Sequence, residues 1–518
     1  MNYPGFYSDL FRATLPETAL EIAALLVLIV DLGFLRTATL KTRVAVAALL
    51  GVAGCAAAAW AVAIAGPYTQ GNDLLLAAGG SAGVAQVGIL VLTALTLFLL
   101  IGSDFTRNAG EYVAVVLMAA AGGLLISAAQ DLLVIFIGLE LLSLGLYILT
   151  AFAKSSGKSA EAAMKYYLFG GMSAAFLLFG FSYLYGLSGS TSLPRVVYGT
   201  YMASAHGATP LLYLALVMIA AGLGFKVAAV PFHLWAPDTY EGAPAPAAAF
   251  IASVSKVASF ALLISISSVA LHFYSELHFQ ILRSYVAVTT SNGPAHIAPG
   301  IPTAWPTVLV VLSAGSMLLG NLAALAQSSV RRLLAYSAIA HAGYILLALA
   351  FFSYSPISTN AILYYILTYG LTTIGAFGVV SVVERATGSD RLDSFLGLHK
   401  RNPLLAAVLL VLFLSLAGIP PLVGFWAKFN LFAAVLSVSA GPVPFALVAL
   451  AIAMSAVSLY YYLQVLKRAY VMPAIDETPI KAHPVTLIVL LAIAAAVVVL
   501  GCFPTLLQNW IASFYPVI

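Results

Sequence analysis

The sequence predicts an all-α integral membrane protein that crosses the bilayer about fourteen times. Of its 518 residues, 62% are hydrophobic and only 8% are charged, with 22 Lys and Arg against 18 Asp and Glu. Soluble proteins carry about 25% charged residues, so this chain could not solvate a surface that faces water on all sides. The composition excludes a soluble enzyme, and the net charge of +4 is too small to indicate nucleic-acid binding.

Fourteen stretches reach the length of about 20 apolar residues that a membrane-spanning helix needs. They begin near Pro16, Val44, Val84, Tyr112, Leu132, Ala163, Leu211, Ala245, Thr303, Leu333, Thr359, Leu404, Pro442 and Pro484. Because the connections are short, we expect a single polytopic membrane domain over residues 1–518. It divides into N-terminal helices (1–110), a first antiporter-like half (111–275), a second half (303–470) and a last helix (484–507).

Lys and Arg are distributed unevenly between the loops on the two sides of these helices. Sixteen fall in loops on one side, whereas only Arg12, Arg195 and Arg283 fall on the other. Short cytoplasmic loops collect positive charge. The sixteen therefore mark the cytoplasmic side, and both termini are expected on the opposite side.

The three remaining basic residues, Lys226, Lys256 and Lys428, lie inside apolar spans. A lysine at the centre of a bilayer costs about 2.5–3.5 kcal/mol. Each could be a structural lysine that extends to the interface or pairs with a carbonyl group, but three in one chain favour a role in ion movement. Glu140 is their acidic counterpart, and its alternative role is to hold helices together. For His341, deep in a later span, a core histidine and a proton relay are both open.

These groups in one row would form a switchable proton path. Burial disfavours the charged form of a side chain, and a nearby opposite charge favours it again. The protonation of one group therefore depends on that of the next. Pro231 follows Lys226 and Pro420–Pro421 precede Lys428, so both lysines lie near predicted helix breaks. Broken helices mark ion sites in transporters, although packing kinks are common as well.

An internal repeat would place the two breaks in matching positions. The segment DLLVIFIGLE begins at residue 131 and RLLAYSAIAH at residue 332, and this offset of 201 aligns Glu140 with His341. Lys226 and Lys428 are 202 residues apart, whereas the tyrosine pairs at 166–167 and 364–365 are 198 apart and fit less well. We therefore predict two inverted five-helix repeats, each with a broken helix. Their half-channels would meet near Lys256.

Motifs for redox cofactors or nucleotides were not found. The sequence has no Gly-rich phosphate loop, no CxxC motif and no pair of intramembrane histidines spaced for haem. We therefore expect no cofactor site and no metal site in this chain. The energy for ion movement would come from a gradient or from partner subunits.

Five segments together carry a resemblance to a known family. They are GLELLSLGLYIL, KYYLFGGMSAAFLLFG, GFKVAAVPFHLWAPDTYEGAPAPAAAFIASVSKVA, RRLLAYSAIAHAGYILLAL and AGIPPLVGFWAKF. They resemble the antiporter-like membrane subunits of respiratory complex I, the proton-translocating NADH:quinone oxidoreductase, and the resemblance extends over all fourteen spans. The W-x-P-D-x-Y-x-G-A-P run and the lysine at position 428 favour the subunit N type over the L and M types.

The resemblance implies a proton pathway through Glu140, Lys226, Lys256, His341 and Lys428. Glu140 would couple to the neighbouring subunit, Lys226 would be its partner in the input half, and Lys428 would belong to the exit half. NAD, FMN, Fe-S clusters and quinone would bind partner subunits, with K- and M-like subunits as neighbours. The expected location is a bacterial inner membrane, and a thylakoid membrane is also possible.

Two alternatives remain open at this point. A subunit of an Mrp-type cation/proton antiporter would share the fold, but a Na⁺ site needs several oxygen ligands. One glutamate with three lysines suits protons better. In a purely structural membrane subunit, the charges would only hold helices together. Lys256→Ala or Lys428→Ala would then reduce assembly and activity in proportion.

Overall fold

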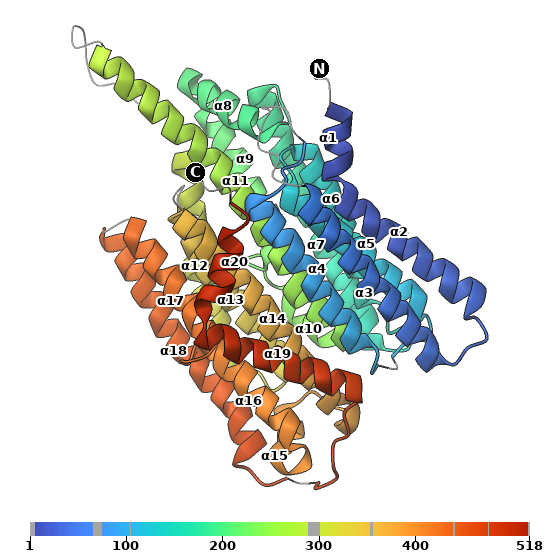
Figure 1. Ribbon diagram of the computed structural model, residues 1–518. Coiled ribbons are helices and arrows are strands. Elements are labelled where there is room, and N and C mark those ends of the chain that lie inside the picture. Colours follow the sequence, from blue (N-terminus) through green and yellow to red (C-terminus); the bar gives the residue numbers. More distant parts are fainter. Residues whose placement is uncertain are drawn as a thin grey trace.

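The computed structural model describes residues 6–65, 75–103, 105–287, 301–352, 356–438, 441–474 and 476–515. Over these residues the chain is helical, with only isolated β-bridges between loop segments. The long helices lie side by side in one bundle (Figure 1). The prediction of an all-α membrane fold is confirmed.

The bundle contains the fourteen predicted passages. Twelve described helices are long and apolar enough to span a bilayer. They are α3 (Leu40–Ala65), α4 (Gly80–Leu100), α5 (Ala109–Ala128), α6 (Leu132–Thr150), α7 (Gly157–Ser188), α9 (Thr209–Val227), α11 (Ala245–Ala287), α12 (Ile301–Leu325), α13 (Val330–Ala350), α14 (Pro356–Thr387), α18 (Pro442–Tyr470) and α19 (Pro484–Cys502).

Two further passages consist of shorter pieces. The first predicted span is α2 (Leu15–Ile29), which continues as the π-helical η1 (Val30–Phe34). The twelfth is divided into α16 (Pro403–Ala417) and α17 (Val423–Val438). The other helices are short: α1 (Phe6–Ala13), α8 (Leu193–Ala203), η2 (Ser204–Ala208), α10 (Trp235–Gly242), η3 (Leu392–Phe395), α15 (Leu398–Arg401) and α20 (Pro504–Ala512).

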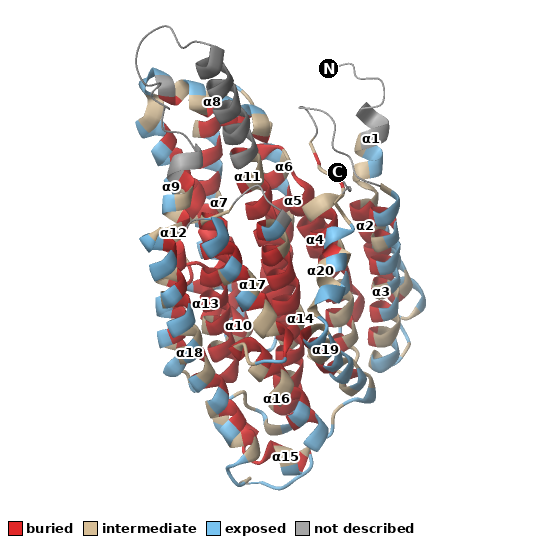
Figure 2. Cartoon of the chain, turned by 60° about the vertical axis from the view of Figure 1, so that its left-hand side comes forward, coloured by how far each residue is buried: buried red, intermediate tan, exposed pale blue. Residues whose placement is uncertain are grey.

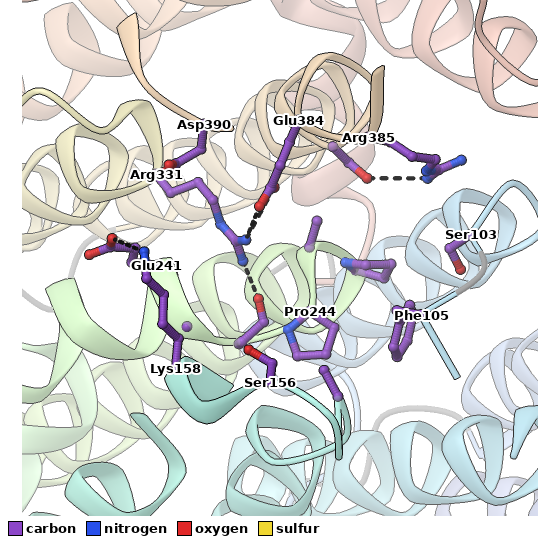
Figure 3. Close-up of a pocket in the computed structure, with 16 residues that line it drawn as sticks. Ser103, Phe105, Ser156, Lys158, Glu241, Pro244, Arg331, Glu384, Arg385 and Asp390 are labelled. Carbon is purple, nitrogen blue, oxygen red and sulfur yellow. Dashed lines mark hydrogen bonds and ion pairs between the residues drawn. The ribbon is translucent and has the colours of Figure 1, made fainter. Parts of the chain in front are cut away.

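Several loops meet at one end of the bundle, which we call the basic end. One cavity there is lined by Phe105 before α5, Lys158 after α6, Pro244 before α11, Arg331 at the start of α13 and Asp390 after α14 (Figure 3). Because these segments share a cavity, the ends of α4, α6, α10, α12 and α14 lie together. This arrangement agrees with the grouping of loops that the basic residues predicted.

The two five-helix units are inverted copies of each other. Asp131 caps α6 and forms a β-bridge with Ser192, beyond α7. In the second unit Ser329 caps α13 and forms a β-bridge with Arg391, beyond α14. Helix α6 ends at the basic end, where α13 begins. The two equivalent helices therefore cross the bundle in opposite directions.

Close glycine contacts give the register of the repeat. A Cβ atom on Gly122 would lie 2.6 Å from the Leu142 nitrogen, and one on Gly320 would lie 2.6 Å from the Ala340 nitrogen. Both members of this contact are shifted by 198 residues between the two halves, as are the capping residues at 131 and 329. Glycine is required here because the helix backbones touch.

The predicted alignment of Glu140 with His341 is therefore wrong. At a register of 198 residues, His341 corresponds to Ser143 and Glu140 corresponds to Ala338. The error of three residues is nearly one helical turn. Such a shift preserves the apolar pattern of a helix, so the pattern alone could not reveal it.

The breaks follow a different offset from the helices. Helix α9 ends before Ala228, at φ +57°, and α16 ends before Gly418, at φ +88°. These left-handed residues are 190 positions apart: α16 begins 194 residues after α9, and it is four residues shorter. Lys226 precedes its break, whereas Lys428 follows its break in α17. The alignment of these two lysines at 202 residues is therefore also wrong.

Helices at the centre of the bundle are almost completely buried. Figure 2 shows α13 and α14 in the buried interior, and the most apolar stretch of α11 is buried as well. Helices α7, α18 and α19 instead expose apolar side chains on the outside. Such a surface suits lipid or neighbouring membrane helices. The buried helices α11 and α13 carry Lys256 and His341.

Candidate functional site

The two breaks expose backbone carbonyl groups inside the apolar core. The last carbonyls of a helix have no partner within that helix. Val227 ends α9 and Ala417 ends α16, and both residues are buried. A buried carbonyl without a hydrogen bond is costly. In both breaks a lysine from the protein core supplies the donor.

Lys256 serves the break of the first half. It lies on α11 and its side chain is 3% exposed. Its ammonium group donates to the Val227 carbonyl and lies 3.4 Å from the Ala338 carbonyl of α13. Lys256 thus joins the end of α9 to α13. This placement agrees with the predicted position near the junction of the two halves.

Lys428 serves the break of the second half. Its Nζ donates to the Ala417 carbonyl at 2.9 Å and to Ser455 Oγ of α18 at 2.8 Å. It also lies 5.5 Å from the centre of the Tyr344 ring. A Cβ atom on Gly418 would lie 3.0 Å from the Lys428 side chain. The glycine therefore supplies both the left-handed turn and the space for this lysine.

Lys226 lies in the last turn of α9, next to the first break. Its ammonium group donates to Ser143 Oγ of α6, and Ser143 donates in turn to the Leu139 carbonyl. Glu140, one turn earlier on α6, acts on Lys226 through its charge. The predicted Glu140–Lys226 pair is therefore an interaction across space, with Ser143 as the direct hydrogen-bond partner.

His341 lies among tyrosines at the centre of α13. Its Nδ1 is 2.7 Å from the Tyr365 hydroxyl of α14, and its ring centre is 4.8 Å from that of Tyr369. The imidazole is 4% exposed and lies within range of the charges of Lys256 and Lys428. His341 is therefore close to both lysines, and its role as a proton relay stays a prediction.

These groups follow one another in a row through the bundle, joined partly by direct contacts and partly by their spacing along α9 and α13. Val227 follows Lys226 directly, Ala338 is one turn from His341, and His341 is one turn from Tyr344. Each group thus touches the next or shares a helix turn with it. In order, the row contains Ser143, Lys226, Val227, Lys256, Ala338, His341, Tyr344, Lys428 and Ser455.

Glu140 differs from the other predicted site residues because it lies at the edge of the bundle. It is half-buried, whereas its helix neighbours Leu133, Ile137, Leu144 and Ile148 are 50–59% exposed. These residues recur at the helical spacing of three and four. Glu140 therefore belongs to an outward apolar stripe of α6 and closes the row on that side.

The sequence analysis missed the hydroxyl groups that serve the lysines. Ser143 and Ser455 both accept hydrogen bonds from buried ammonium groups. Serine is common in membrane helices, so neither residue stood out by type. A signal was present for Ser143, which lies one turn from Glu140 and matches His341 at the 198-residue register.

The short helix α10 completes the broken seventh span at the basic end. Asp238 accepts from Lys165 at 2.8 Å and from Arg332 at 2.7 Å. Partial burial of Asp238 opposes its ionisation, but the two cations outweigh this effect and hold the pKa of Asp238 below its usual value. The Trp235 ring stacks on Tyr166 at 4.3 Å. The W-x-P-D motif is thus an anchor for α10.

In the parts of the chain that the structure describes, His, Cys, Asp and Glu form no group of three or more that could hold a metal ion.

Comparison with known proteins places this geometry in a family. The family described as "NADH:quinone oxidoreductase/Mrp antiporter, TM" matches residues 129–292 and 295–455. NADH-quinone oxidoreductase subunit N 2 of Acidobacterium capsulatum is 48% identical, over 98% of this chain and 99% of its own. Subunit N of an Anaeromyxobacter species is 37% identical, over 96% and 94%.

Solved structures show the same fold. A chain of respiratory complex I from Thermus thermophilus with bound aureothin has a TM-score of 0.74 and 33% identity, over 95% of this chain and 98% of that chain. A chain of the Mrp complex from a Dietzia species has a TM-score of 0.77, over 97% and 96%, but only 21% identity, so it supports the fold alone. On these matches and on the broken-helix geometry, the chain belongs to the antiporter-like NADH-quinone oxidoreductase subunit N family.

Proposed function

We propose that this chain is the proton-translocating membrane-arm subunit N of an NADH:quinone oxidoreductase. In this role it is part of a translocase and carries protons through the buried row. Electron transfer from NADH to quinone, with its NAD, FMN and Fe-S cofactors, belongs to partner subunits. The basic end faces the cytoplasm of a bacterial cell, with the bundle in the inner membrane.

The row from Ser143 to Ser455 is the observation that carries this proposal. Three buried lysines and a histidine are expensive in a membrane protein and are retained mainly at ion pathways. Each lysine has hydrogen-bond acceptors within the protein, so an ammonium group is tolerated at each position. A proton that leaves one group changes the electrostatic balance at the next.

The proposed sequence of events begins at the edge of the bundle. A change of charge at Glu140 alters the balance at Lys226, whose ammonium group is held by Ser143. Lys226 and Lys256 meet at the end of α9, so a proton shift at one changes the environment of the other. His341 relays the proton toward Lys428 and the second break. A charge change at Glu140 is therefore coupled to proton movement through a switch between two charge distributions along the row.

Glu140 also indicates where a neighbouring subunit binds. A half-exposed carboxylate within an apolar stripe is unfavourable against lipid. A neighbouring membrane subunit that covers this face of α6 would shield Glu140 and connect its charge to the next subunit. We assign this face to a K- or M-like neighbour of the membrane arm.

The first experiment combines quinone reductase activity and proton pumping in membranes that carry the assembled complex with Lys226→Ala. The matched control is Lys481→Ala, because Lys481 is exposed on the loop between α18 and α19. If the row translocates protons, both activities fall steeply with Lys226→Ala, the amount of assembled complex stays constant, and the control behaves like the parent.

Other results would favour the alternatives. Normal quinone reduction and pumping with Lys226→Ala would overturn the proposal. Loss of both activities in strict proportion to lost assembly would favour a structural role for the lysine. Loss of sodium-dependent transport in membranes without quinone reductase activity would favour a cation/proton antiporter.

A further inference from the structure

A polar cavity opens at the basic end between the two halves. It has a volume of about 280 Å³. Lys158, Arg331 and Arg385 line it together with Glu241, Glu384 and Asp390, so basic and acidic side chains balance (Figure 3). Arg331 bonds the Tyr240 carbonyl at 2.9 Å and Glu384 at 3.2 Å, which fixes α10 at the mouth. A balanced polar cavity of this size holds water rather than one type of ion.

A second, smaller cavity continues inward along α14. Its volume is about 10 Å³, which is room for about one water molecule. It shares Ala245, Pro246 and Ser381 with the first cavity, and Phe377 is among its other lining residues. The two cavities thus lead from the basic end toward the buried part of α14.

Beyond Phe377, one ridge of α14 carries hydroxyl groups as far as His341. Ser381, Phe377, Thr373, Tyr369 and Tyr365 recur every four residues, about 6 Å apart along the axis. Tyr365 and Tyr369 contact the His341 ring. The ridge therefore connects the small cavity to the row of buried charges, with Phe377 as its single apolar member.

Buried hydroxyl groups without a standard hydrogen bond flank this apolar member. Thr373, Thr239 and Tyr240 are almost fully buried, and their hydroxyl oxygens make no hydrogen bond of standard geometry within the described part of the chain, although Thr373 lies close enough to interact with the Tyr369 hydroxyl. By contrast, Thr368 and Thr372 on the same helix bond their own backbone. The Tyr240 ring meets Phe377 edge-on at 5.7 Å, and its hydroxyl is in electrostatic range of Tyr369. Buried polar groups of this kind are normally satisfied by water.

We propose that water molecules bound to Tyr240, Thr239 and Thr373 form the proton uptake path from the basic-end cavity to His341, past a constriction at Phe377. This inference rests on the proposed function, and it names the side chains by which protons reach the row. Tyr240 supplies the bridge around Phe377, and Thr373 with Tyr369 supplies the inner segment. Arg331 acts as a positioning residue because it fixes α10 and therefore Tyr240.

The test uses the assembled complex in sealed membrane vesicles and compares the initial rate of proton pumping in four variants. Thr373→Val removes one hydroxyl at nearly constant volume, and Thr373→Ser restores it. Tyr240→Phe keeps the ring against Phe377, so it tests the path even where Thr373→Val assembles poorly. Tyr112→Phe is the matched control, because Tyr112 is fully buried on α5 and its hydroxyl has no partner among the described residues.

With a proton path through these hydroxyls, Thr373→Val and Tyr240→Phe lower pumping about tenfold, the rate change that one lost hydrogen bond of a proton wire produces. The solvent deuterium isotope effect on pumping rises in both variants, since proton uptake becomes limiting. Thr373→Ser recovers most of the rate, and Tyr112→Phe leaves rate and isotope effect unchanged. A structural role would not raise the isotope effect.

Lys256→Met separates failure of this inference from failure of the proposed function. If Lys256→Met stops pumping while Thr373→Val and Tyr240→Phe pump at the parent rate, the uptake path is refuted and the function stands. If Lys256→Met pumps normally, the proposed function itself fails. Equal losses in Tyr112→Phe and Tyr240→Phe would also refute the path.

Discussion

Asp238 is the side chain through which the seventh span is anchored at the basic end, and its removal tests that reasoning. The carboxylate joins α10 to Lys165 of α7 and Arg332 of α13 at 2.8 Å and 2.7 Å. Asp238→Asn keeps the shape of the side chain and removes its charge. Both ion pairs of Asp238 are lost, while Arg332 keeps its ion pair with Glu241 and Lys165 keeps its ion pair with Glu161. We expect α10 to open more often from the bundle.

The size of the effect follows from the exposure of the three groups. Asp238 is 29% exposed, Arg332 is 30% exposed and Lys165 is 41% exposed, so water screens the charges. An exposed pair contributes about 0.2–1 kcal/mol, so two such pairs contribute about 0.4–2 kcal/mol. The opening equilibrium of α10 should therefore rise about 2- to 30-fold.

Hydrogen exchange of the α10 backbone amides measures this opening directly, because exchange reports local unfolding. The variant should exchange faster in α10 only. Asp393→Asn is the control, since Asp393 is 73% exposed and lies 3.8 Å from Arg468 at the same end. Unchanged exchange in Asp238→Asn would refute the anchor, and so would an equal increase in the control.

The difference in α10 hydrogen exchange between Asp238→Asn and the parent protein should depend on pH with a defined sign. The pKa of Asp238 is lower in the folded protein than its usual value of about 3.9. The ionised anchor therefore contributes its full stability above that usual value and loses it as pH falls through the folded pKa. The ratio of exchange rates between variant and parent should be constant from about pH 8 to 5. A ratio of exchange rates that fell to one between pH 8 and 6 would contradict this assignment.

Three further predictions concern the row and the packing around it. Lys428→Met should lower quinone reduction and pumping together by about 10²-fold at constant assembly; activity lost only in proportion to assembly would contradict this. Arg43→Met leaves the buried Asp31 without its bidentate partner and should cost about 3 kcal/mol. Arg43→Met should lower the inactivation temperature of the complex. Adding Asp31→Asn to Arg43→Met should restore part of the lost stability. Gly122→Val drives a side chain into the backbone of α6, so it should destabilise the fold by about 1–3 kcal/mol and reduce the amount of assembled complex. Gly171→Val meets open space and should leave the amount of assembled complex unchanged.

The fold was largely predictable because the bilayer imposes a length and a charge rule on the chain. Runs of apolar residues predicted all fourteen passages, and the Lys and Arg distribution predicted which loops meet at the basic end. Pro231 and the Pro420–Pro421 pair also predicted both breaks, since proline removes a backbone donor. Each of these signals is local in sequence and can be identified without any knowledge of how the helices pack.

The partners of the lysines were not predictable in the same way. Lys256 and Lys428 donate to carbonyl groups at Val227 and Ala417, and every residue carries such a carbonyl. Only the position of a helix end distinguishes these two, and that position depends on left-handed residues such as Ala228. Alanine gives no sequence signal for that conformation. Charged residues in a membrane span can therefore be found from sequence, but their acceptors require the fold.

The corrected register changes how the row should be understood. Because the halves are inverted, equivalent residues beside the two breaks would lie toward opposite ends of the bundle. Lys226 instead precedes its break and Lys428 follows its own, so both lysines are displaced toward the end opposite the basic one. The backbone breaks obey the inverted repeat, whereas the lysines depart from it. Strict symmetry would instead place one lysine on the side of its break that faces the basic end and the other on the opposite side. The fold thus provides two equivalent breaks, and the placement of the lysines makes them successive steps of one path.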